Sequence, residues 1–75
     1  MKITGTSSYM LVEYDNKMVK IQGEMMVGRF LAYSDSIKSW EPPHDHTVID
    51  DLTKAKIIDA VIEKTKKSKV IIEFE

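Results

Sequence analysis

The residues best suited to chemistry lie in one polar stretch. His44 and His46 stand two positions apart there, with carboxylates from Glu41 and Asp45 beside them. Such side chains could supply part of a zinc or nickel site. A protein metal site, however, needs three or four ligands in a fixed geometry, and histidines in a polar loop commonly face solvent. We therefore predict no metal site and no cofactor.

No other stretch forms a catalytic motif. The chain has no cysteine, no glycine-rich phosphate loop, and no serine within a nucleophile motif. A chain of 75 residues also offers little room for a cleft that excludes water. We predict that the protein is not an enzyme and has no catalytic residues.

Acidic residues are concentrated between a strand predicted at residues 37–40 and a helix predicted at residues 51–66. They are Glu41, Asp45, Asp50 and Asp51, and Asp35 lies in a turn shortly before them. Acidic stretches of this kind are often simply solvated surface, but they can also steer a basic partner. The total net charge of −1 argues against binding of nucleic acid.

Trp40 and the methionine pair Met25-Met26 allow two interpretations each. The single tryptophan either fills the core or anchors a protein contact, where tryptophan is enriched. The methionines either fill gaps in the core, which we favour, or line a binding surface. The candidate partner-binding residues are Asp35, Trp40, Glu41, Asp45, Asp50 and Asp51.

One helix is predicted over residues 51–66, and it must position the acidic residues that lead into it. At about 100° per residue, the apolar side chains fall on an arc roughly 160° wide, which predicts one broad buried face. This arc contains Ala55, Ile57, Ile58, Val61 and Ile62. Acidic residues at positions 50 and 51 stand where a helix cap is expected.

Strands are predicted on both sides of the helix. A hairpin is expected from residues 9–14 and 18–23, followed by a kink between Gly23 and Gly28, a strand at 29–33 and a short fourth strand at 37–40. Ile3 could begin a further short strand, and residues 70–74 form the last one. The predicted fold is a single α+β domain, 1–75. It is an antiparallel β-meander of about four strands, with one amphipathic helix packed on the sheet and one C-terminal strand.

Three segments resemble a known family when taken in order and spacing. They read KIQGE at 20–24, FLAYxxSIKxWEPP at 30–43 and KII at 56–58. Together they resemble small bacterial immunity proteins of polymorphic toxin systems, the Immunity protein 74 family among them. The resemblance implies a cytoplasmic protein that binds and occludes a cognate toxin domain, without catalysis and without a cofactor. The absence of a signal-peptide or membrane-spanning hydrophobic run also predicts a cytoplasmic protein that does not enter a membrane. The alternative is a structural or regulatory protein-interaction domain unrelated to toxins.

Overall fold

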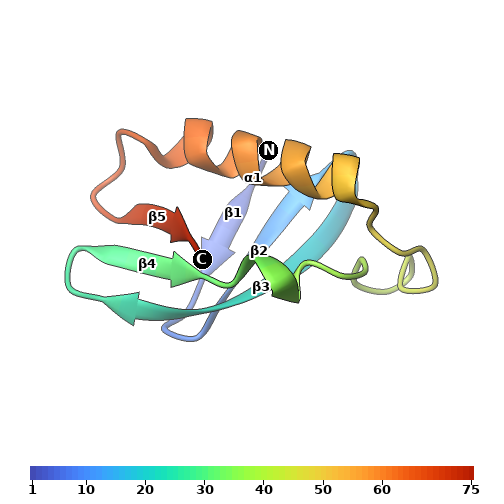
Figure 1. The fold of residues 1–75 in the computed structure, drawn as a ribbon, viewed down its shortest axis with the longest axis horizontal. Coiled ribbons are helices and arrows are strands. Elements are labelled where there is room, and N and C mark those ends of the chain that lie inside the picture. Colours follow the sequence, from blue (N-terminus) through green and yellow to red (C-terminus); the bar gives the residue numbers. More distant parts are fainter.

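The computed structural model describes residues 1–75 as one five-stranded sheet with a single α-helix across it (Figure 1). The elements in chain order are β1 (Ile3–Gly5), β2 (Tyr9–Tyr14), β3 (Lys17–Met26), β4 (Arg29–Ala32), the 3-10 turn η1 (Ser34–Ser36), α1 (Asp51–Thr65) and β5 (Ile71–Phe74). Strands β1 to β4 form an antiparallel meander, and β5 returns to lie parallel beside β4. The predicted α+β class, with a meander, a helix and a returning strand, is confirmed.

The β2–β3 hairpin follows directly from its turn residues. Asp15 and Asn16 have φ of 55° and 60°, the left-handed values that a two-residue type I′ turn requires at both central positions. Short polar side chains tolerate this conformation better than others. The predicted hairpin is therefore confirmed, and the turn fixes its register, with Tyr14 opposite Lys17.

Strand β3 belongs to both halves of the sheet. Residues 17–22 pair with β2, and residues 23–26 pair with β4. The kink predicted between Gly23 and Gly28 does not end the strand, because β3 runs through Gly23 to Met26 and the chain turns at Val27-Gly28. The strand predicted from Arg29 is confirmed as β4. Figure 1 shows β3 as one long, curved ribbon that runs from beside β2 to below β4.

The predicted strand at 37–40 is also wrong. After η1, the chain follows the edge of β3 with single contacts instead of a ladder. The hydroxyl of Ser36 accepts the backbone N–H of Gln22 at 2.9 Å, and the N–H of Glu41 donates to the carbonyl of Met18 at 2.7 Å. A side chain thus occupies a position that a neighbouring strand would fill, and the fourth strand of the meander is supplied by β1.

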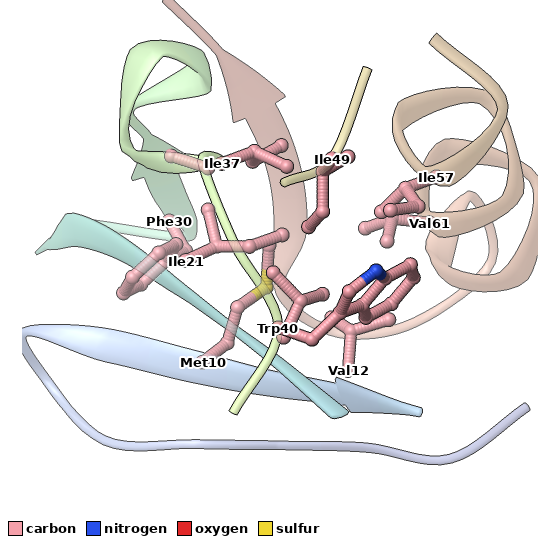
Figure 2. Packing of buried hydrophobic residues seen from close by; sticks show 11 residues of the cluster. Met10, Val12, Ile21, Phe30, Ile37, Trp40, Ile49, Ile57 and Val61 are labelled. Carbon is pink, nitrogen blue, oxygen red and sulfur yellow. The ribbon is translucent and has the colours of Figure 1, made fainter. Parts of the chain in front are cut away.

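The core lies between the sheet, α1 and the segment that follows η1 (Figure 2). Trp40 belongs to it, with only 5% of its surface exposed, and its ring points toward α1 in Figure 2. The ammonium group of Lys17 lies 5.4 Å from the ring centroid, a cation–π contact at the edge of the core. Trp40 therefore fills the core, and its burial removes it as an exposed contact anchor. The buried residues are Met10, Val12, Val19, Ile21, Phe30, Ala32, Ile37, Trp40, Ile49, Ile57 and Val61.

Helix α1 buries a narrower face than the sequence predicts. Of the predicted arc, only Ile57 and Val61 are fully buried, whereas Ile58 is half-buried, Ile62 is 44% exposed and Ala55 faces solvent. The helix rests on the sheet along a line through Ile57 and Val61, and one margin of the predicted arc stays uncovered. No helix is both long and apolar enough to cross a bilayer.

The favoured interpretation of the methionine pair is wrong. Met25 and Met26 lie on the far part of β3 and are 44% and 39% exposed. Met25 lines an apolar groove of about 250 Å³ between β1 and β5, together with Phe30 and Ile72. The two methionines are therefore surface residues at the β3–β4 end of the molecule.

Candidate functional site

The acidic segment, residues 35–51, is a loop closed on itself. The N–H of Ile49 donates to the carbonyl of Lys38 at 2.8 Å, and Ser39 forms an isolated β-bridge with Val48. Inside this closure, the chain makes two further turns through the carbonyls of Glu41 and His44. Figure 1 shows the loop beyond the N-terminal end of α1. The two sides of the loop are thus held together before the helix begins.

Three buried side chains anchor this segment to the core. Ile37, Trp40 and Ile49 are 3%, 5% and 6% exposed, so apolar contacts fix both sides of the loop. Burying a side chain of this size contributes about 1.5–3 kcal/mol relative to leaving it exposed. The polar residues between them are therefore carried on a positioned backbone.

The carboxylates of the segment point outward from this anchored backbone. Asp35, Asp45, Asp50 and Asp51 are exposed, and Glu41 is half-buried. None of the three salt bridges in the structure involves any of them. The acidic segment therefore presents carboxylates that form no salt bridge within the chain.

The charge of the molecule is divided along its length. Five carboxylates and the single lysine Lys38 give residues 35–51 a net charge of −4 with neutral histidines. Lys64, Lys66, Lys67 and Lys69 lie at and beyond the other end of α1. The molecule is 35 Å long, and the helix lies along this axis in Figure 1. An uneven charge distribution of this kind can orient a charged partner on approach.

Asp50 is the acidic residue with a defined structural role. It caps α1, because its carboxylate accepts the backbone N–H of Thr53 at 2.7 Å. Hydrogen bonding from the side chain and then the backbone of Thr53 lowers the pKa of Asp50 below its ordinary value of 3.8, and the positive charge of Lys56 adds to the effect. The predicted helix start is confirmed, with Asp50 as the cap.

A pH dependence follows from this cap. A carboxylate whose pKa is lowered on folding stabilises the protein above its unfolded pKa, and this contribution is lost as the pH falls through the folded pKa. We expect Asp50→Asn, which keeps a capping acceptor but cannot titrate, to show a flatter fall in stability below about pH 4 than the wild type. Urea unfolding at a series of acidic pH values measures this, and parallel curves for the two proteins would contradict it.

His44 and His46 both lie in the loop between η1 and α1. His44 is half-buried and His46 is exposed. No group of three or more histidine, cysteine, aspartate or glutamate side chains gathers closely enough to hold a metal ion. That the protein has no metal site stays a prediction.

The surface residues that sequence reasoning missed are apolar. Val48 is 77% exposed within the acidic segment, and Leu52 and Ile62 are exposed on α1. Helical periodicity assigned Ile62 to a buried face and left Leu52 outside it, because periodicity gives the width of an apolar arc and not how the helix is rolled on the sheet. The exposure of Val48, directly before the buried Ile49, follows from the alternation of an extended segment.

The larger hollow on the surface lies elsewhere and has a mixed lining. It has a volume of about 570 Å³ and lies between the β2–β3 turn and α1, with Glu13, Tyr14, Asp15 and Glu63 in its wall. The acidic segment therefore remains the candidate site, as a surface for contact with another protein.

Comparison with known proteins gives one match. A family model described as Immunity protein 74 matches residues 2–75, essentially the whole chain. No curated protein and no solved structure matches the chain. The three segments that carry the resemblance in the sequence all fall inside the matched range.

Proposed function

The chain belongs to the Immunity protein 74 family, and from this premise we propose that it binds a cognate bacterial toxin domain in the cytoplasm and blocks it by occlusion. It acts in equal proportion to the toxin and performs no catalysis. The contact surface is the acidic segment, with Asp35, Glu41, Asp45, Asp50 and Asp51 facing the partner. Trp40 supports this surface from the core and does not touch the partner.

The observation that carries the proposal is a set of unpaired carboxylates on a backbone that is already held in place. Ordering a loop on binding costs free energy, and a loop anchored by Ile37, Trp40 and Ile49 avoids much of that cost. Unpaired carboxylates attract a basic surface and raise the association rate. The partner that fits is a toxin domain whose functional site is surrounded by lysine or arginine and must be unblocked for the toxin to act.

Charge reversal at the acidic segment tests the proposal. We expect the triple variant Asp35→Lys/Asp45→Lys/Asp51→Lys to associate more slowly by on the order of tenfold or more at low salt, with a smaller difference at high salt. Asp50 is left in place so that the helix cap is kept. The probe is the C-terminal domain encoded by the toxin gene that neighbours the gene for this chain, and stopped-flow or surface-based kinetics give the rates.

The matched control changes net charge equally at other places. Glu24, Glu63 and Glu75 are exposed, and their reversal to lysine should leave association with the same domain nearly unchanged. Equal effects of both triple variants would move the contact surface away from the acidic segment. Growth of cells that co-express the toxin domain tests the function itself. No protection by the wild-type protein would reject the immunity role and leave a protein-interaction domain unrelated to toxins.

A further inference from the structure

Helix α1 carries a row of apolar side chains that the core does not use. Leu52, Ala55, Ile58 and Ile62, here called the helix strip, fall within about 120° around the helix axis. Leu52, Ala55 and Ile62 are exposed and Ile58 is half-buried, whereas Ile57 and Val61 beside them are fully buried. Scattered exposed apolar residues are ordinary on a protein surface, but a row along one side of a helix is typical of a contact surface.

The helix strip continues directly from the acidic segment. Leu52 follows the capping residue Asp50 and the first-turn residue Asp51, and the exposed Val48 lies just before them. Asp59 is exposed on the same side of the helix. The result is an apolar row bordered by carboxylates at its N-terminal end and by charged side chains of both signs, Asp59 and Lys56, along one margin. Protein interfaces commonly have this arrangement, with an apolar centre and a charged rim.

We propose that the helix strip is the apolar centre of the toxin contact and that the acidic segment is its charged rim. This inference rests on the proposed function and adds to it the part of the surface that holds the complex together. The partner surface that fits has an exposed apolar ridge or shallow groove with lysine or arginine beside it. Leu52 is the principal anchor, because it is 67% exposed, against 44% for Ile62, and lies next to the carboxylates.

The two parts of this surface act on different rates. Charges at a rim mainly change how fast two proteins meet, whereas buried apolar anchors mainly change how slowly they separate. The helix strip should therefore control dissociation, and the acidic segment should control association. This separation lets one set of kinetic measurements test each part by itself.

The test replaces the anchors without changing charge. We expect Leu52→Gln/Ile62→Gln to dissociate from the neighbouring toxin's C-terminal domain at least about tenfold faster than the wild type, with little change in association. Both positions are exposed and glutamine is a good helix former, so the melting curve should stay close to that of the wild type. The single variant Leu52→Gln gives the same test with the smaller change to the helix.

The control is the other exposed apolar cluster of the molecule. Val27 and Ile71, at the β3–β4 turn and the start of β5, are 103% and 52% exposed, and Val27→Gln/Ile71→Gln should dissociate like the wild type. Faster dissociation of this control, with dissociation of the helix-strip variants unchanged, would overturn the inference and place the apolar contact at the β3–β4 turn. Unchanged dissociation of the helix-strip variants, with slow association of the acidic-segment variant, would overturn the inference alone. Failure of the wild type to bind would overturn the proposed function as well.

Discussion

Val61→Asp is expected to unfold the protein. Val61 is fully buried and packs from α1 into the core that contains Trp40 and Ile57. An isolated carboxylate there has no partner, and burying it costs several kcal/mol, against a total stability of about 5–15 kcal/mol for a typical domain. The far-ultraviolet circular dichroism spectrum and the thermal melting curve at neutral pH measure the outcome.

The neighbouring residue supplies the control for this prediction. Ile62 is 44% exposed, so Ile62→Asp places the same charge on the same turn of the helix, where water can solvate it. We expect a native spectrum and a melting temperature within a few degrees of the wild type. A cooperative, native-like transition for Val61→Asp would mean that α1 does not rest on the sheet along Ile57 and Val61.

Gly23→Ala is expected to have the second largest effect. A Cβ atom at Gly23 would lie 2.4 Å from the carbonyl oxygen of Leu31 and 2.4 Å from an edge carbon of the Phe30 ring. One of these contacts is with backbone, so the β3–β4 ladder itself must shift to relieve it. Overpacking of this kind costs about 1–3 kcal/mol, and for a domain of this size about 1 kcal/mol lowers the melting temperature by 4–8 °C.

Gly28→Asn is the matched control for the glycine prediction. Gly28 has a φ of 76° but no atom within 4 Å of the added Cβ, and asparagine tolerates left-handed backbone. We expect it to be destabilised less than Gly23→Ala in calorimetry. The reverse order would show that space beside Phe30 is not what requires glycine at position 23.

Sequence patterns predicted the elements that depend on neighbouring residues. The cap at Asp50, the apolar periodicity of α1 and the polar turn at Asp15-Asn16 are all local signals, and each has its expected structural counterpart. The strand predicted at 37–40 had a suitable composition, but the segment meets the edge of β3 through single hydrogen bonds and forms no ladder. The edge of β3 is met there by the hydroxyl of Ser36, a residue 14 positions from its partner Gln22, and no local pattern contains that contact.

The candidate site was predictable in its charge but not in its apolar part. The exposure of Asp45, Asp50 and Asp51 agrees with an acidic loop before a helix. The burial of Trp40 and the exposure of Met25 depend on the tertiary arrangement, because Trp40 joins the core cluster that contains Ile57 of α1, whereas Met25 lies outside it. Periodicity sets which residues share a side of an element, and the tertiary arrangement sets which side is covered.

The parallel pairing of β4 with β5 has a consequence during protein synthesis. A nascent chain folds from its N-terminal side at about 5–20 residues per second, so β1 to β4 can pair while α1 is still being made. Strand β4, however, cannot pair with β5 until residues 71–74 have been made, because Phe30 pairs with Ile72 and Ala32 pairs with Phe74. Until then, β4 exposes an unpaired strand edge, which is a template for association with other chains. A ribosome that stalls between α1 and β5 therefore yields an aggregation-prone fragment and not a shorter working protein.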